Sequence, residues 1–176
     1  IGKDVGQHAQ ELIAHGADIV YVIDHPALEN FVDELYTHAL TDLILKEKPN
    51  KLLLPASTIG RSFGSRVAIT ANTGITADAT ELAIDPATRM LHATRPSFGG
   101  NLMATILCEK HRPEMATVRP MAFPRSPRVE GRTGKVVTVP VDLSKWKQRT
   151  RFVRFEVEKG QEQDITAAEI IVAGGR

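Results

Sequence analysis

Hydrophobic and polar positions change their period several times along the first part of the chain. Residues 4–18, 26–48 and 58–72 repeat apolar side chains three or four positions apart, which predicts amphipathic helices. Residues 18–24 and 52–56 are short apolar runs of the kind found in buried parallel strands. The order helix, strand, helix, strand, helix is typical of an α/β domain with a parallel sheet.

The later part of the chain predicts strands instead of helices. Segments 82–96, 101–109 and 114–120 are strand-like and separated by turn signals such as Asp85-Pro86. Residues 134–143 and 151–159 alternate enough to predict an antiparallel pair near a sheet edge. We therefore expect an α/β fold, a three-layer Rossmann-like domain with a mostly parallel sheet plus a smaller antiparallel strand set.

Composition narrows the class of protein further. The chain has 176 residues, 42% hydrophobic and 24% charged, which suits one ordinary globular domain. No apolar run approaches the ~20 residues that span a bilayer, so we expect no membrane span. The single cysteine, Cys108, excludes an internal disulfide and fits a reducing compartment. We expect a cytoplasmic protein.

Charge is uneven along the chain. Residues 110–154 hold 12 lysines and arginines against 3 acidic residues. Such a segment is either a surface for an acidic partner or a solvated connection, and residues 119–134, rich in proline and arginine, predict a linker. Few aromatic residues interrupt the basic segment, so we expect no nucleic-acid binding.

The segment "TRPSFGGN", residues 94–101, combines a cation with a bare backbone. Gly99 and Gly100 permit positive φ and close backbone approach, and Asn101 adds a donor and an acceptor. Arg95 offers a planar, permanent cation that stacks or forks onto a ring or a carboxylate. This pattern suits a flat, electron-rich or anionic ligand. The structural alternative is a β-hairpin turn with a solvated arginine.

The loop at residues 55–66 follows a buried strand and opens a helix, a position where α/β proteins bind ligands. Ser57, Thr58, Gly60 and Arg61 could hold a phosphate there, but the loop matches no phosphate-binding motif. An ordinary capped strand-to-helix loop is the favoured interpretation.

Other polar residues carry weaker signals. Asp78, in "TADAT", is expected to cap the neighbouring segment rather than touch a ligand. Arg119, at a strand end, is expected to be a surface or interface charge. The six histidines and Cys108 have no metal-ligand spacing, and no catalytic triad can be assembled. We expect no metal and no catalytic side chain, so any redox chemistry would need a cofactor.

Several segments together resemble one family, the α subunit of electron transfer flavoproteins, and its FixB-like bacterial members in particular. The resemblance extends from about Asp4 to Arg176. The segments, in order, are "GADIVYVIDHP", "LLLPASTIGRSFGSRVA", "TGITADATEL", "TRPSFGGNLMATI", "RPEMATVRP" and "AEIIVAGGR".

The resemblance implies a heterodimer with a β subunit that passes electrons between a dehydrogenase or NADH and a quinone- or ferredoxin-linked acceptor. It implies an N-terminal α/β domain over residues 1–165. A C-terminal FAD-binding domain would begin within residues 166–176, where Gly174, Gly175 and Arg176 stand. We expect the remainder of that domain, and an initial strand before Ile1, to be missing. FAD is then expected in the full-length heterodimer and not in this piece alone.

The motifs "TRPxFGGN" and "TGxTADxT" resemble family members that oxidise NADH or bifurcate electrons, in which the β subunit holds a second flavin. By this resemblance Arg95 approaches that flavin's ring, and Gly99, Gly100 and Asn101 pack at the subunit junction. A simpler carrier with AMP in the β subunit stays open, as does NAD there. The alternative from another class is a stand-alone nucleotide-binding regulatory module of the universal-stress type.

Overall fold

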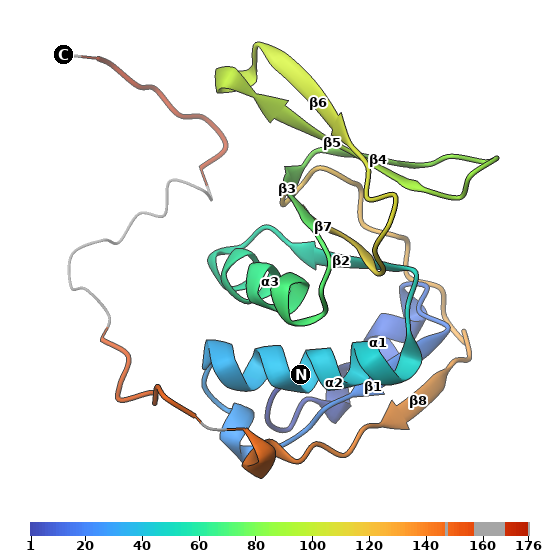
Figure 1. Ribbon diagram of the computed structural model, residues 1–176, viewed down its shortest axis with the longest axis vertical. Helices are drawn as coiled ribbons and strands as arrows, with labels where there is room; N and C mark the ends of the chain where they lie inside the picture. The colour runs from blue at the N-terminus through green and yellow to red at the C-terminus, as the bar shows by residue number, and fades with distance from the viewer. Residues whose placement is uncertain (147, 157–167, 176) are drawn as a thin grey trace.

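The computed structural model describes residues 1–146, 148–156 and 168–175 (Figure 1). The helices are α1 (Ala9–Ala14), α2 (Asp33–Glu47) and α3 (Thr58–Thr70), with 3-10 turns at Gly6–His8, Pro26–Leu28, Phe98–Gly100 and Leu143–Lys145. The strands are β1 (Ile19–Val22), β2 (Lys51–Pro55), β3 (Ile75–Ala79), β4 (Glu81–Ile84), β5 (Leu91–Ser97), β6 (Leu102–Ile106), β7 (Glu114–Val118) and β8 (Lys135–Thr138).

The described strands form two parallel sheets and one antiparallel sheet. The order β2-β7-β3 is parallel throughout, and β1 pairs in parallel with β8. Strands β4, β5 and β6 form an antiparallel sheet that projects from the α/β part (Figure 1). The expected fold class, α/β with mostly parallel strands and a smaller antiparallel set, is confirmed.

Helix α2 packs against both parallel sheets. Ile44 belongs to a core cluster with Leu54 of β2, whereas Leu35 and Ala39 belong to a second cluster with Ile23, the residue after β1. The opposite face of β1 is covered by α1, whose Ala9 and Ile13 pack on Val20 and Val22. Strand β1 therefore lies between two helices, which gives this part of the molecule its three layers.

A small buried cluster attaches the antiparallel sheet to the parallel one. Ala79, Ala93 and Ala116 meet with Leu91 where β3, β5 and β7 come together. The carboxylate of Glu114, 2% exposed, accepts a hydrogen bond from the N–H of Leu91 and pairs with two cations. Nζ of Lys51 lies 3.4 Å from Glu114 Oε1, and Nε of Arg112 lies 3.3 Å from the same oxygen.

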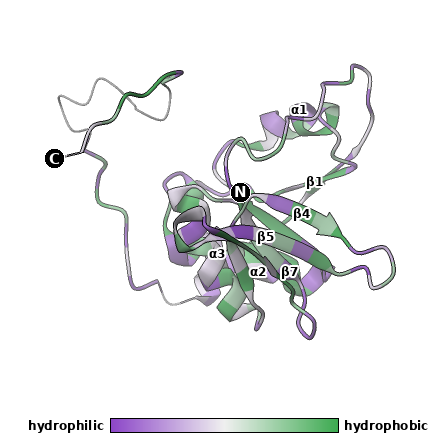
Figure 2. Cartoon of the chain, turned by 90° about the horizontal axis from the view of Figure 1, so that it is seen from above, coloured by the Kyte–Doolittle hydropathy of each residue, from purple (hydrophilic) through white to green (hydrophobic). Residues whose placement is uncertain are grey.

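Two surfaces remain open among the described residues. Strand β2 has a neighbour on one side only, and Leu53 in it is 48% exposed. The antiparallel sheet also carries exposed apolar side chains, and β4 and β5 are partly green in Figure 2. The exposed apolar residues of that sheet include Ile84, Leu102, Met103 and Ile106.

The two N-terminal helices are shorter than expected. Instead of a helix over 4–18, α1 begins at Ala9, because the Asp24 carboxylate accepts the N–H groups of Asp4 and Val5 and holds a turn there. Instead of a helix over 26–48, a 3-10 turn capped by His25 ends early and α2 begins at Asp33.

The expected antiparallel pair of 134–143 with 151–159 is wrong. Strand β8 pairs in parallel with β1, because Lys135 N–H donates to Asp18 O and brings the chain in beside the start of β1. Residues 151–156 form no strand, and 157–159 lie outside the described residues. The expected linker carries no helix or strand, yet it is fastened to α1: Ser126 O bonds His15, and Val129 N–H donates to Ala14 O.

Candidate functional site

The carboxyl ends of β2, β7 and β3 meet at one edge of their sheet. Leu54 of β2 lies opposite Thr117 of β7, and Ala79 of β3 lies opposite Val118. The loop after β2, the residue Asp78 and the residue Arg119 therefore share this edge, although they lie far apart in the sequence. Open α/β sheets bind ligands at such edges.

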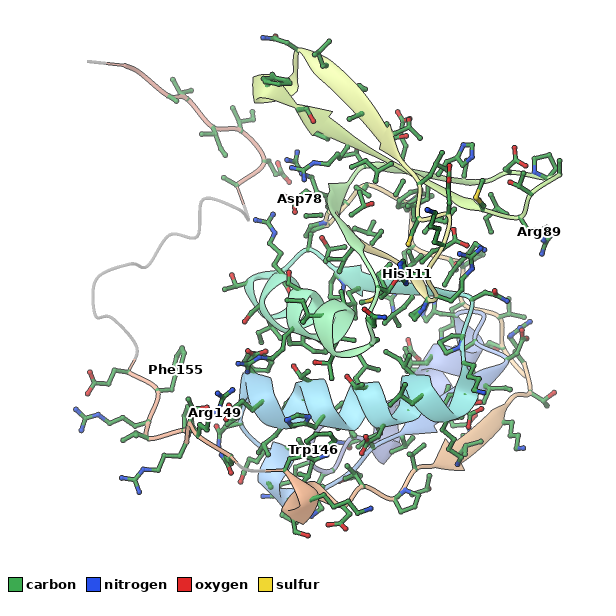
Figure 3. The ribbon with its side chains drawn as sticks, in the orientation of Figure 1. Asp78, Arg89, His111, Trp146, Arg149 and Phe155 are labelled. Atoms are coloured by element: carbon green, nitrogen blue, oxygen red, sulfur yellow. The ribbon has the colours of Figure 1, made fainter. Side chains whose placement is uncertain are left out.

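Asp78 connects this edge to the start of α3. Its Oδ1 lies 3.0 Å from Nε of Arg61, and its N–H donates to Thr117 Oγ1 at 2.9 Å. Its φ is 61°, within an irregularity of the β3–β7 ladder. The expected capping role is wrong: the carboxylate of Asp78, labelled in Figure 3, pairs with an arginine on the preceding helix, α3.

The loop at residues 55–66 has the geometry of an ordinary helix cap. Ser57 Oγ accepts the N–H of Gly60 at 3.1 Å. A Cβ on Gly60 would lie 1.9 Å from Pro55 O, so this glycine lets the helix start close to the strand end. The favoured structural interpretation of this loop is confirmed, and one N–H that a phosphate would use is already bonded.

The "TRPSFGGN" segment forms the end of β5 and the turn into β6. Phe98, Gly99 and Gly100 have φ of 49°, 68° and 95°, so the turn needs three successive left-handed residues. No atom lies within 4 Å of a Cβ built on either glycine, so conformation and not crowding selects them here. The hairpin alternative is correct for the backbone.

A depression of about 610 Å³ lies beside this turn. Arg95 and Arg119 line it together with residues 96–100. Arg119 reaches it because its N–H donates to Ala79 O, next to the strand that carries Arg95. The structure thus brings Arg95, Gly99 and Gly100 to one concave surface whose volume suits a small-molecule ligand.

Among the described residues, three buried polar atoms without a hydrogen-bond partner lie near this depression, although only one of their residues, Arg95, lines it. Within the described part of the chain, Asp78 Oδ1, Thr80 Oγ1 and Arg95 Nε are such atoms, and two more, His38 Nδ1 and Thr41 Oγ1, lie on α2. The Asp78–Arg61 contact has ion-pair distance without hydrogen-bond geometry. Thr80, between β3 and β4, donates its N–H to Thr94 O and so lies beside the strand that carries Arg95. Buried groups of this kind are uncommon, and a bound partner is one way to complete their hydrogen bonding.

The remaining expected site residues lie elsewhere. Asn101 ends the turn, with its N–H 3.4 Å from Phe98 O, and does not line the depression. Gly174 and Gly175 are exposed in the described segment 168–175, and Arg176 lies outside the described residues.

Chemically, the depression offers positive charge and bare backbone. Within the ranges that the structure describes, no group of three or more metal-ligating side chains is present. The two arginines can stabilise negative charge or stack on a flat ring. The arrangement therefore suits the binding of a ligand and the electrostatic stabilisation of negative charge on that ligand.

Sequence reasoning missed a second polar cluster, on α2. The Glu34 carboxylate, in a residue 5% exposed, accepts hydrogen bonds from Arg149 and Thr150, and these bonds lower its pKa to about 2. His38 stacks on Trp146 with 3.9 Å between ring centroids, and burial lowers the His38 pKa. More than 100 residues separate these partners in sequence, so no local sequence pattern predicts that they are in contact.

Comparison with known proteins defines the class. The model of the electron transfer flavoprotein domain matches residues 1–144. The matched part includes both parallel sheets and the depression, and the chain belongs to this family.

Individual relatives agree with this assignment. The chain is 45% identical over 176 residues to the electron transfer flavoprotein subunit alpha of Megasphaera elsdenii, covering all of this chain and 52% of the relative. It is 43% identical over 176 residues to that of Thermoanaerobacterium thermosaccharolyticum, covering 100% and 53%. Protein FixB of Azorhizobium caulinodans is 42% identical over 171 residues, covering 96% and 46%. The chain thus spans about half the length of these relatives. No described helix is long and apolar enough to cross a bilayer.

Proposed function

We propose that this chain is the N-terminal α/β domain of the α subunit of a heterodimeric electron transfer flavoprotein. The family match and two relatives named as alpha subunits support this role. In the complete subunit, residues after about 165 begin the domain that binds FAD. Electrons pass from a dehydrogenase or NADH to a quinone- or ferredoxin-linked acceptor, and the protein works in the cytoplasm.

The depression beside the β5–β6 turn faces the cofactor of the β subunit in this proposal. The observation that carries it is the buried, unpartnered Nε of Arg95 beside a depression lined by Arg119 and the glycine turn. A flavin ring accepts hydrogen bonds along its edge, and a guanidinium close to it favours its anionic reduced or semiquinone forms. The bare turn permits close approach, and Asn101 packs at the subunit junction.

The first experiment counts cofactors. The full-length α subunit is co-expressed with its β subunit, the complex is denatured, and the released flavin and nucleotide are quantified. Two FAD per heterodimer support a second flavin against this domain. One FAD with one AMP supports the simple carrier, in which the depression contacts AMP or protein. A complex without flavin contradicts the proposed function.

The second experiment tests Arg95 itself. In the intact heterodimer, Arg95→Ala is expected to lower the reduction potential of the β-subunit flavin and destabilise its anionic semiquinone. Arg125→Ala, which removes an exposed arginine on the linker, is the matched control. Unchanged potentials and NADH reactivity in Arg95→Ala would contradict the assigned role.

A stand-alone nucleotide-binding module fits the structure less well. In the loop that would bind a phosphate, the Gly60 N–H already donates to Ser57 Oγ. The absence of a side chain at Gly60 lets the helix start close to Pro55. The family match points to the flavoprotein instead.

A further inference from the structure

Residues 142–146 and 148–150, which we call the strap, lie against α2 after the end of β8. Asp142 caps the short turn Leu143–Lys145 by accepting Ser144 N–H at 3.1 Å. Leu143 packs against the core cluster that contains Leu35 of α2. The strap is therefore anchored at its beginning by an apolar contact.

Glu34 anchors the other end of the strap. Its Oε2 accepts the N–H of Arg149 at 2.8 Å, the N–H of Thr150 at 3.2 Å and Thr150 Oγ1 at 3.3 Å. Its Oε1 accepts Nε of Arg149 at 2.9 Å. Four donors from two adjacent residues converge on one buried carboxylate, and bonds to an ionised acceptor are stronger than neutral ones.

An aromatic stack lies between the two anchors. The rings of His38 and Trp146 are inclined by only 7° and their centroids are 3.9 Å apart. Figure 3 shows Trp146 below α2 and Arg149 beside the left end of that helix. A depression of about 430 Å³ remains between the strap and α2, lined in part by Arg66 and Thr70 of α3.

The described hydrogen bonds between the strap and α2 end at Thr150. Residues 151–156 are exposed, and their one described ion pair joins Arg154 to Glu156 within the segment itself. Phe152, Val153 and Phe155 are exposed as well. The contrast between four bonds at residues 149–150 and no described bond to the domain afterwards marks a sharp boundary along the chain.

We propose that the Glu34–His38 face of α2 is an intramolecular docking site for the strap, and that it fixes Thr150 as the point from which the C-terminal part of the protein departs. Any domain that follows is then tethered at a defined place on α2. Its point of attachment is then Thr150 and not the end of β8. This inference does not depend on the identity of any cofactor.

Hydrogen–deuterium exchange in the full-length protein with its partner subunit tests the proposal. Glu34→Gln keeps the shape of the side chain and removes the charge, so the Arg149 and Thr150 amides are expected to exchange at least about tenfold faster. Exchange in α3 should stay unchanged. Glu29→Gln, which breaks an exposed ion pair with Lys3, is the matched control and should leave the strap unaffected.

Two outcomes overturn the proposal. One is unchanged exchange at residues 149–150 in Glu34→Gln; the other is an equal rise throughout α3, which would mean global destabilisation. Should Glu34→Gln fail to fold, Trp146→Leu removes the stack from a partly exposed position. It is expected to raise exchange in the strap alone, and unchanged exchange there would equally contradict docking.

Discussion

Nε of Arg61 lies 3.0 Å from Oδ1 of Asp78, so the first turn of α3 is tied to the end of β3. The arginine side chain is 53% exposed and the aspartate 18%. A pair this accessible is screened by water and contributes about 0.5 kcal/mol. The backbone conformation of Asp78 contributes to stability separately from the ion pair. Its φ is left-handed, a conformation that asparagine adopts readily and alanine does not.

Two substitutions at Asp78 separate these effects. Asp78→Asn is expected to lower the free energy of unfolding by about 0.5 kcal/mol through the lost ion pair. Asp78→Ala should cost about 1 kcal/mol more, because it also places a Cβ-bearing residue without a polar side chain at φ 61°. Urea unfolding measures both. Equal losses would show that the backbone conformation contributes nothing.

Gly60→Ala should strongly destabilise the protein. The added Cβ would lie 1.9 Å from Pro55 O, a backbone atom that cannot swing away, and overpacking of this kind costs about 2–3 kcal/mol. Gly74→Ala is the control, because no atom lies within 4 Å of its Cβ position and its φ is not positive. Thermal unfolding of the two variants side by side checks the difference. A shift of similar size in both would contradict the close approach of helix and strand.

Glu114→Ala tests the junction between the sheets. Removal of this buried carboxylate leaves Lys51 and Arg112 without their shared partner and the Leu91 N–H unbonded, at an expected cost of about 3 kcal/mol. Glu81→Ala, on the exposed side of β4, should change the unfolding free energy by less than about 0.5 kcal/mol. Chemical denaturation gives both values. A small loss at Glu114 would mean that the apolar contacts alone hold the antiparallel sheet.

The stabilising effect of Glu34 should disappear in acid. Its pKa is lowered from 4.5 to about 2 in the folded protein, chiefly by the Arg149 N–H. A lowered folded-state pKa means that the contribution is complete above about pH 4.5 and is lost as the pH falls toward 2. The difference in urea midpoint between the unsubstituted protein and Glu34→Gln should therefore shrink between pH 5 and pH 3. A difference independent of pH would indicate that shape, and not charge, matters at this position.

Local patterns predicted the elements that local interactions stabilise. The unbroken apolar run of β2, the helix after Ser57 and the turn at Asp85 were all visible, because each depends on neighbours within a few residues. The candidate site was predicted in part: Arg95, Gly99 and Gly100 line one depression, although their role toward a cofactor stays a prediction.

Long-range partners could not be predicted. The apolar alternation of 134–143 indicates a strand but not its neighbour. Strand β8 lies beside β1 because the linker runs along α1 and brings the chain there. The acids of the first turn of α2 look like ordinary helix-start residues, so nothing marks Glu34 as the acceptor for Arg149. Asp78 and Arg61 meet for the same kind of reason, since sheet topology and not spacing brings them together.

The one-sided pairing of β2 has a consequence for how the chain behaves in concentrated solution. Among the residues that the structure describes, no strand pairs with its outer edge. This edge therefore presents unpaired backbone donors and acceptors on a strand whose sequence is KLLLP, and Leu53 adds an exposed apolar side chain. Such an edge is a template on which another extended chain can pair. Lys51 does little to repel a second copy, because its ammonium is occupied by Arg89 O and Glu114. Preparations of this chain by itself should therefore lose monomer as concentration rises, and β2 is where the aggregates begin.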